Sequence, residues 1–483
     1  MSDTSKSAGD DSSTAAEVRR RFGHVATPAA RRDAGRERRK KLPLESHAEL
    51  CADQDRDDPL ALLAGQDQGR VQDLVPIRYG RMSKNAFTFL RGAAAVMASD
   101  LSKTPHTDLT AQLCGDAHVS NFGIFNSPDR RLVFDVNDFD ETLPGPFEWD
   151  LKRLVASVAV AARHNGIKKK DARAAVKEAV KRFRKTIAEV AAMDPLTLHA
   201  FRIEVDEVAA QVKSGKRKKA LDKTTKKASK KNSLRALNKL TDIVDGRRVI
   251  VPDPPLILPL HEVNAEAMDE IAAFFEDYRV TLPDSRRHVL DQYSVVDVAM
   301  KVVGVGSVGM RALVILLESG AGDPLFLQFK EATDSVLAPY LAPSVYGQAG
   351  QRVVEGQRLT QATSDVFLGW ARWSVGAGDR DPDGHRHIDF YFRQLWDGKG
   401  SADVDSMGPK ALKAYAGQCG AALALAQARS GDAAMIQGYV GDDNTLDKAL
   451  ADFAAAYDDR NEADYERLEA AIADGSIPVE TDL

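Results

Sequence analysis

A block of strand-like sequence, enclosed on both sides by helix-like sequence, is the feature that most constrains the fold of this chain. From Val295 the chain runs through VVDVAMKVVGVGSVGMRALVILLES and PLFLQFKEA, three extended apolar segments separated by glycine turns. Two further extended pieces, FLGWARW and HIDFYFRQLW, follow a short helical stretch, and helical spacing dominates before the block and beyond Gly400. We therefore expect an α+β fold with a small antiparallel sheet lobe and a larger, mainly helical lobe.

Two polar turns upstream of this block carry side chains that can bind cations or protons. The turns are GDAHVSN at 115–121 and FDVNDFDE at 134–141, the second of which follows a strand-like run. The candidate residues are Asp116, His118 and Asn121 in the first turn and Asp135, Asp138 and Asp140 in the second. Oxygen ligands from two adjacent turns suit Mg²⁺, which keeps part of its water shell while it bridges phosphates. The alternative is that these Asp and Asn side chains only cap helices and turns, and we expect His118 to brace its loop by hydrogen bonding.

A glycine motif lies inside the strand block. Gly304, Gly306 and Gly309 form GxGxxG between the first two extended segments, and Lys330 lies on the third. Glycines at these positions let backbone amides approach phosphates closely, and a Lys on a strand can neutralise phosphate charge. Because no helix is predicted to begin at the third glycine, the motif disfavours a dinucleotide-binding fold. Glycines that only serve hairpin turns are the alternative.

Three arginines precede these motifs. They are Arg78 and Arg81 in IRYGRM and Arg91 in FLRGA. An Arg can bind phosphate or a substrate carboxylate through its planar fork, and it can equally be a charge on a helix surface. The sequence leaves both interpretations open.

The motifs resemble two known groups of proteins. GDAHVSN and NDFDE are similar to the catalytic and metal-binding loops of the aminoglycoside and choline kinase group, within the protein-kinase-like superfamily. EWDLKRL resembles the aspartate helix that follows the metal loop in that superfamily, with Asp150 as the anchoring residue. Over roughly residues 70–465, segments such as RYGRM, LCGDAHVSNFG, FDVNDFDETLPGPFEWDLKRL and GQRVVEGQR resemble an uncharacterised bacterial family, domain-of-unknown-function family 2252.

The resemblance implies a protein-kinase-like fold that binds ATP and Mg²⁺. It implies a catalytic loop with Asp116 and His118, metal ligands Asn121 and Asp138 supported by Asp140 or Asp135, and a nucleotide site formed by Gly304, Gly306, Gly309, Lys330 and its partner Glu355. Because the glycine loop and Lys330 follow the Asp and Asn set in this chain instead of preceding it, the fold would be circularly permuted. The implied activity is ATP- and Mg²⁺-dependent phosphate transfer to an unidentified small-molecule hydroxyl or amine. The alternatives are a non-catalytic, nucleotide-binding pseudokinase or scaffold, and a nucleotidyl (AMP) transferase.

Charge and composition divide the chain further. The net charge of −5 conceals a segment, residues 211–240, with twelve Lys or Arg and one Asp, which we expect to be solvated and which could alternatively bind an acidic partner or nucleic acid. The expected units are a disordered tail (1–45), a helical lobe with the catalytic and metal loops (46–210), a basic insertion (211–245), a connector (246–290), the sheet lobe (291–400) and helices that return to the helical lobe (401–483). We expect a cytoplasmic protein without a membrane span. Its three cysteines are widely spaced, and the sequence shows neither the apolar core of a secretory signal nor a run of about twenty apolar residues.

Overall fold

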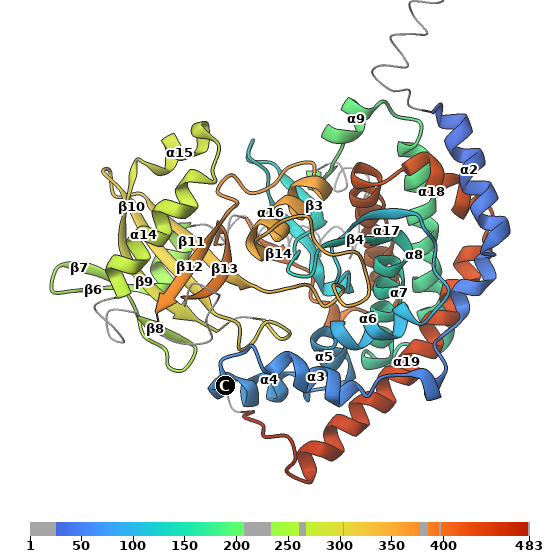
Figure 1. The fold of residues 1–483 in the computed structure, drawn as a ribbon, viewed down its shortest axis with the longest axis horizontal. Helices are drawn as coiled ribbons and strands as arrows, with labels where there is room; N and C mark the ends of the chain where they lie inside the picture. Colours follow the sequence, from blue (N-terminus) through green and yellow to red (C-terminus); the bar gives the residue numbers. More distant parts are fainter. Residues whose placement is uncertain are drawn as a thin grey trace, which may run out of the picture.

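The computed structural model describes residues 26–206, 233–259, 267–302, 304–376, 385–395 and 398–481. They form a mainly helical lobe and a lobe built on a six-stranded antiparallel sheet (Figure 1). This confirms the predicted α+β class with antiparallel sheets. Most of the basic segment at 211–240 lies outside the described residues, and its described end forms α12 (Ser233–Leu240). No helix among the described residues is long and apolar enough to cross a membrane.

The sheet lobe has the strand order β12–β13–β11–β10–β9–β8. Its strands are β8 (Ile257–Pro259), β9 (Tyr293–Lys301), β10 (Ala312–Ser319), β11 (Pro324–Ala332), β12 (Gly369–Gly376) and β13 (His385–Gln394). A separate hairpin of β6 (Thr241–Val244) and β7 (Arg247–Ile250) precedes the sheet. Because adjacent residues of a strand face opposite sides, Ile315 packs in the cluster under α14 (Ala267–Val280), whereas Leu316 packs with α12 on the other face.

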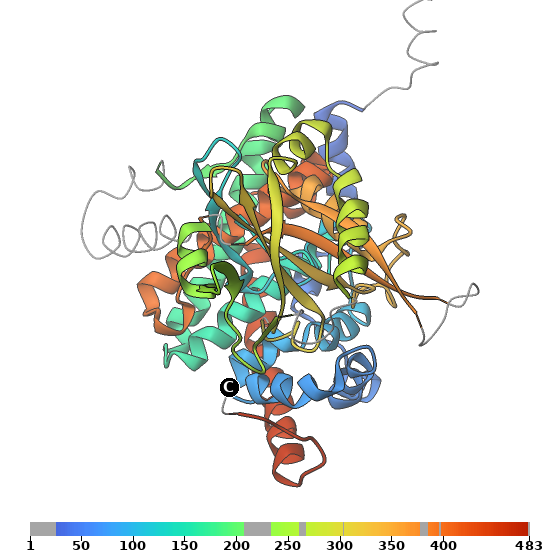
Figure 2. The same ribbon diagram turned by 90° about the vertical axis from the view of Figure 1, so that its left-hand side faces the viewer.

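Residues 246–290, which we predicted to be a connector, contribute to this sheet lobe. They supply the edge strand β8 and two helices, α14 and α15 (Asp284–Leu290), and α14 lies across one face of the sheet (Figure 2). The physical reason is an aromatic face on α14. Phe274 lies against Phe329 of β11, and the ring of Tyr278 stacks on Phe392 with 3.9 Å between ring centroids. These large apolar rings are buried when α14 packs on the sheet, and this burial holds the helix there.

The helical lobe is centred on α7 (Phe147–His164), which is buried along almost its whole length. The helices of this lobe that precede it are α2 (Pro28–Lys41), α3 (Pro59–Asp67), α4 (Val75–Met82), α5 (Ala86–Gly92) and α6 (Ala94–Ser102). Those that follow it are α8 (Lys169–Val190), α9 (Pro195–Ala200), α17 (Pro409–Ser430), α18 (Ala433–Val440) and α19 (Thr445–Ala473). α17 and α19 pack on α7 and α8, so the C-terminal helices complete a core begun much earlier in the chain (Figure 1).

Residues 28–41, which we predicted to lie in a disordered tail, form α2 and pack on α18. Two glycines allow this close crossing. A Cβ atom on Gly35 would lie 2.0 Å from the carbonyl oxygen of Met435, and one on Gly438 would lie 2.0 Å from that of Arg32. Arg39 adds hydrogen bonds to the carbonyl oxygens of Gly438 and Tyr439. The sequence did not predict this contact because the segment is highly charged and has little hydrophobic pattern. Much of the contact comes from the close approach of the two backbones instead of from buried apolar side chains.

Short strands in the helical lobe carry the two polar loops. β1 (Thr110–Leu113) pairs with β4 (Leu143–Pro146), and β2 (Phe122–Asn126) pairs with β3 (Leu132–Val136). β14 (Gly400–Ser401) and β5 (Ile203–Glu204) flank the second pair. The chain therefore passes from β1 through the loop at 114–121 to β2, and from β3 through the loop at 137–142 to β4. Because both loops leave from the same strand pairs, they lie next to one another.

Candidate functional site

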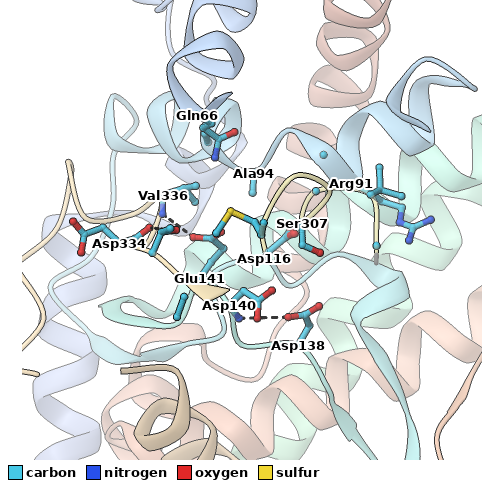
Figure 3. A pocket seen from close by; sticks show the side chains of 18 of the residues that line it. Gln66, Arg91, Ala94, Asp116, Asp138, Asp140, Glu141, Ser307, Asp334 and Val336 are labelled. Atoms are coloured by element: carbon cyan, nitrogen blue, oxygen red, sulfur yellow. Dashed lines mark hydrogen bonds between the residues drawn. The ribbon is translucent and has the colours of Figure 1, made fainter. Parts of the chain in front are cut away.

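A cavity of about 550 Å³ lies where the two lobes meet (Figure 3). Its walls come from both polar loops, the glycine loop at 304–307, helices α3, α5 and α6, and residues 331–340. Seven of the eleven predicted site residues line it: Asp116, His118, Asn121, Asp138, Asp140, Gly304 and Gly306. Segments nearly 200 residues apart in sequence thus present their polar groups to one space.

One face of α7 holds the loop at 114–121 in place. The carboxylate of Asp150 accepts hydrogen bonds from the backbone N–H groups of Cys114 (2.8 Å) and Gly115 (3.0 Å), the anchoring that the kinase resemblance implies. Arg153 donates from Nε to Oδ1 of Asp116 over 2.7 Å, and the hydroxyl of Ser157 accepts from the N–H of Val119 over 2.8 Å.

Positions 150, 153 and 157 follow the spacing of one helix face, so the three side chains meet the same loop. Sequence reasoning missed Arg153 and Ser157. The signal that could have found them is a polar stripe at helical spacing on an otherwise apolar helix.

Burial of Asp150 makes the stability of this loop depend on pH. Burial raises the pKa of Asp150 to about 6, against the opposing effect of the two backbone hydrogen bonds. When the pKa of a carboxyl group rises on folding, the group stabilises the fold fully below its pKa in the unfolded chain, which is about 4. This stabilisation is lost as the pH rises through the pKa in the folded protein, which is about 6.

The variant Asp150→Asn has no carboxyl group to titrate at this position. We therefore expect the unfolding free energy of the wild type, relative to that of this variant, to fall by about 2–3 kcal/mol between pH 4 and pH 7. Urea titrations at both pH values measure this difference, and an equal difference at both would contradict the expectation.

The two polar loops are locked together by backbone contacts. Gly115 has a φ of +85°, and a Cβ atom there would lie 2.1 Å from the carbonyl oxygen of Glu141 in the second loop. The amide of Asn121 donates from Nδ2 to the carbonyl oxygen of Asp116 over 2.8 Å. The carbonyl oxygen Oδ1 of Asn121 accepts no hydrogen bond from the residues that the structure describes, so it is available as a cation ligand at the cavity wall.

Asp138 and Asp140 have different environments. Burial acts to raise the pKa of Asp138, but Lys330, Arg393 and Lys399 outweigh it and hold that pKa below its ordinary value, so this carboxylate stays ionised. Asp140 is occupied: its Oδ2 forms the ion pair with Lys330, and its Oδ1 accepts a 2.6 Å hydrogen bond from the hydroxyl of Tyr391. Asp138 is therefore the carboxylate of this loop that can bind a metal ion. Asp140 instead holds Lys330 in position.

The predicted pair between Lys330 and Glu355 is not formed. Glu355, on α16 (Ala349–Thr360), pairs with Arg358 one helical turn away, at 2.9 Å. The residue of α16 that reaches the metal loop is Arg352, which donates to the carbonyl oxygens of Thr142 (2.6 Å) and Asp140 (2.8 Å). Positions three residues apart lie on neighbouring parts of a helix surface, so the packing of α16 against the loop, and not helical spacing, decides which of the two side chains reaches it.

The structure places Asp135 and His118, which we predicted as a supporting ligand and a catalytic residue, in different surroundings. Asp135 lies within β3, outside the cavity lining; its Oδ2 is 3.9 Å from Arg429, and burial raises its pKa to about 6. His118 lines the cavity with Nε2 at 3.7 Å from Oδ2 of Asp116, and burial lowers its pKa to about 3. His118 is therefore uncharged near neutral pH and adds no positive charge to the site.

The glycine loop joins β9 to β10 and is fixed from the helical lobe. Its carbonyl oxygens are bound there: Arg81 donates to Gly304 (2.6 Å), Arg70 donates to Val308, and the N–H of Val71 donates to Gly309 (2.9 Å). Gly304 and Gly309 adopt φ values of +78° and +89°, which L side chains rarely tolerate.

The amides of this loop remain available. Among the described residues, the N–H groups of positions 304–307 donate to no acceptor, and these positions line the cavity. Successive unpaired N–H groups form a concavity that binds anions. The loop therefore has backbone N–H groups without an acceptor in the described part of the chain, at positions that line the cavity.

The structure gives different surroundings to the three arginines for which the sequence left open a ligand-binding role or a place on a helix surface. Arg78 is fully buried and pairs with Asp67 at 2.6 Å, which makes it a packing residue. Arg81 holds the glycine loop, as described above. Arg91 alone of the three lines the cavity.

A second cavity, of about 340 Å³, adjoins the first and shares Asp138, Gly304 and Ser307 with it. Its lining contains four cations: Lys301, Lys330, Arg393 and Lys399. Burial, together with the charge of Arg393, lowers the pKa of Lys399 to about 7. Among its lining residues only Asp138 and Asp365 are acidic, so this cavity suits a ligand with several negative charges. Sequence reasoning found Lys330 but missed Arg393 and Lys399.

The donor set fits a hard, oxygen-seeking cation that keeps much of its water. Within the described ranges no cluster of three or more His, Cys, Asp and Glu side chains could hold a metal ion by itself. Asp138 and Asn121 instead offer one ionised carboxylate and one amide oxygen at the same cavity. Mg²⁺ is commonly bound by one or two such ligands together with waters and substrate phosphates.

Comparison with known proteins gives one match. The sequence model of a family described as an uncharacterized protein conserved in bacteria (DUF2252) matches residues 70–471. Searches of curated proteins and of solved structures return no match to this chain. The matched region contains both polar loops, α7, the glycine loop, the lining of the second cavity and the lining of the first except Leu62, Gly65, Gln66 and Gly69. The chain therefore belongs to the uncharacterised bacterial family DUF2252.

Proposed function

We propose that this protein is an ATP- and Mg²⁺-dependent phosphotransferase with a circularly permuted, protein-kinase-like fold. The observation that carries the proposal is the convergence of the two polar loops and the glycine loop on one cavity, beside a second cavity lined by cations. In protein kinases a glycine-rich loop covers the nucleotide phosphates, a strand Lys contacts them, and an Asp and an Asn hold the metal ions. Each of these residue types borders one of the two cavities here.

The proposed chemistry relies on positioning and charge. The nucleotide phosphates lie along the amides at 304–307, with Lys330 and Lys399 neutralising their charge. Asp116 accepts a hydrogen bond from the acceptor hydroxyl or amine and takes its proton as the acceptor atom bonds to the γ-phosphorus. The bond from that phosphorus to the bridging oxygen breaks, and ADP leaves with the electron pair. Arg153, bound to Oδ1 of Asp116, leaves Oδ2 to face the acceptor.

Asp138 and Asn121 are the residues that would hold Mg²⁺. When bound there, Mg²⁺ would offset the negative charge that develops on the phosphate oxygens. Lys330, Arg393 and Lys399 keep Asp138 ionised, so the ligand is in its metal-binding form at neutral pH.

The permutation is supported by the route of the chain. The sheet lobe follows the catalytic loops in sequence, and α17 and α19 then return to pack on α7 and α8. An ion pair between Lys330 of the sheet lobe and Asp140 of the helical lobe joins the two parts at the site. In the proposed permutation the order of the motifs along the chain differs from that of a kinase, and their arrangement around the site is the same.

The size of the first cavity favours a small acceptor. Helix α3 and residues 333–340 line this cavity and not the second one, and its volume of about 550 Å³ is that of a small-molecule site. We propose a hydroxyl or amine of a small molecule as the group that accepts the phosphate.

A thermal-shift titration tests nucleotide binding directly. We expect ATP with Mg²⁺ to raise the melting temperature by several degrees, because a ligand at about 100 times its Kd adds about 2.7 kcal/mol of stability. ATP without Mg²⁺ is expected to give a smaller shift, since Asp138 then faces the phosphates without a cation between them. No shift at millimolar ATP in either condition would overturn the proposal.

A further inference from the structure

Arg91 lies at the point where the glycine loop meets the helical lobe. A Cβ atom placed on Gly306, at the tip of the loop, would lie 3.3 Å from the carbonyl oxygen of Arg91. Arg91 is one of the residues that line the same cavity as Asp116 and Ser307, and Figure 3 shows its side chain to one side of them. Its positive charge also acts on the first polar loop. There it contributes to the lowered pKa of His118, although burial and the charge of Arg153 lower that pKa more. Arg91 therefore borders both the glycine loop and the loop that carries Asp116.

The guanidinium of Arg91 has no partner in the described part of the chain. It forms no hydrogen bond and no ion pair there, and its Nε is buried without an acceptor. Burial lowers the pKa of Arg91, and Asp405 and Asp116 offset this only in part. A buried donor without a partner costs free energy, so such groups in native proteins call for a ligand or another explanation.

The other arginines around the cavity are all engaged. Arg70 and Arg81 bind carbonyl oxygens of the glycine loop, Arg78 pairs with Asp67, and Arg153 pairs with Asp116. Arg91 is thus the arginine at this site that is free to bind a ligand, among the residues that the structure describes.

We propose that Arg91 binds the terminal phosphate of the nucleotide and neutralises its charge while the phosphoryl group passes to the acceptor. This inference rests on the proposed function. The acceptor must lie next to Asp116, and the phosphates lie along the glycine loop, so the transferred group passes between these two elements. Arg91 borders both of them. Its planar fork matches phosphate oxygens, and an arginine supplied by the same chain has this role in some nucleotide hydrolases.

A carboxylate on the acceptor is the other anion that Arg91 could bind, and a nucleotide-only experiment separates the two ligands. Binding of Mg²⁺·ADP and of Mg²⁺ with the non-hydrolysable β,γ-imido analogue of ATP is measured by calorimetry for the wild type, Arg91→Gln and Arg91→Lys. Arg36→Gln, an exposed arginine on α2, is the matched control.

We expect the wild type and the control to bind the triphosphate analogue more tightly than ADP. In Arg91→Gln this preference is expected to fall about tenfold or more, while the affinity for ADP stays unchanged and so reports that the variant is folded. Arg91→Lys is expected to keep part of the preference, because it retains the charge without the fork.

The outcomes that contradict the inference are distinct from those that contradict the proposed function. An unchanged preference in Arg91→Gln, with both nucleotides still bound, would overturn the role of Arg91 and leave the phosphotransferase proposal standing. A wild type that binds neither nucleotide would overturn both.

Discussion

Asp138→Asn is expected to abolish the Mg²⁺-dependent part of ATP binding and to reduce phosphate transfer by about 1000-fold or more. Asp138 is the carboxylate that the two cavities share, and the cations around it keep it ionised. Asn preserves the shape of the side chain but removes the charge that holds a divalent cation. Because the variant also leaves three cations without this counter-charge, its affinity for ATP in the absence of Mg²⁺ is expected to stay the same or to rise.

The measurement is a melting-temperature titration with ATP, with and without Mg²⁺, on the wild type and the variant. Asp334→Asn is the matched control, since Asp334 is an exposed carboxylate at the wall of the first cavity alone. The control is expected to keep the Mg²⁺-dependent shift. A full Mg²⁺-dependent shift in Asp138→Asn would show that the cation is held elsewhere.

Asp116→Asn is expected to lower the turnover number about 1000-fold while leaving the affinity for Mg²⁺·ATP within about twofold of the wild type. The carboxylate of Asp116 is the proposed proton acceptor, and an amide cannot take that proton. The side chain keeps an oxygen for the hydrogen bond from Arg153, so the loop is expected to remain in place. The loss of the charge beside Arg153 is expected to destabilise the fold by about 1–3 kcal/mol.

Asp135→Asn provides the control for this variant. Asp135 belongs to the same run of carboxylates in sequence, but it faces Arg429 outside the cavity, so its replacement is expected to leave turnover unchanged. Equal turnover in the wild type and Asp116→Asn would remove Asp116 from the mechanism. Equal losses in the Asp116 and Asp135 variants would indicate a general effect on folding.

The sequence was sufficient to predict the features that depend on local pattern. Alternation and glycine turns from Val295 onward predicted the antiparallel sheet, and the types of residue in GDAHVSN and FDVNDFDE predicted two loops that meet. Asp150 was implied as the anchor by the resemblance of EWDLKRL to the aspartate helix of the kinase-like superfamily, and its carboxylate accepts the backbone hydrogen bonds of the first polar loop.

Features that depend on how elements rotate and cross could not be predicted. Whether Glu355 or Arg352 reaches the second polar loop depends on how α16 packs against that loop, and the partner of Lys330 depends on how closely the lobes approach. The contact of α2 with α18 depends on the glycine at position 35, whose neighbour across the crossing lies about 400 residues away in sequence. Arg393 gains its place at the second cavity from the pairing of β13 with β11, and Lys399 gains its place from the path of the chain after β13.

Transfer of labelled phosphate tests the central claim most directly. The protein is incubated with Mg²⁺ and ATP labelled at the γ-phosphate, together with a bacterial small-molecule extract, and the products are separated and identified by mass spectrometry. The proposed function predicts a labelled small molecule that forms with the wild type and is absent with Asp116→Asn. Label that stays in ATP and inorganic phosphate, from a wild type shown to bind Mg²⁺·ATP, would contradict phosphate transfer to a small-molecule acceptor.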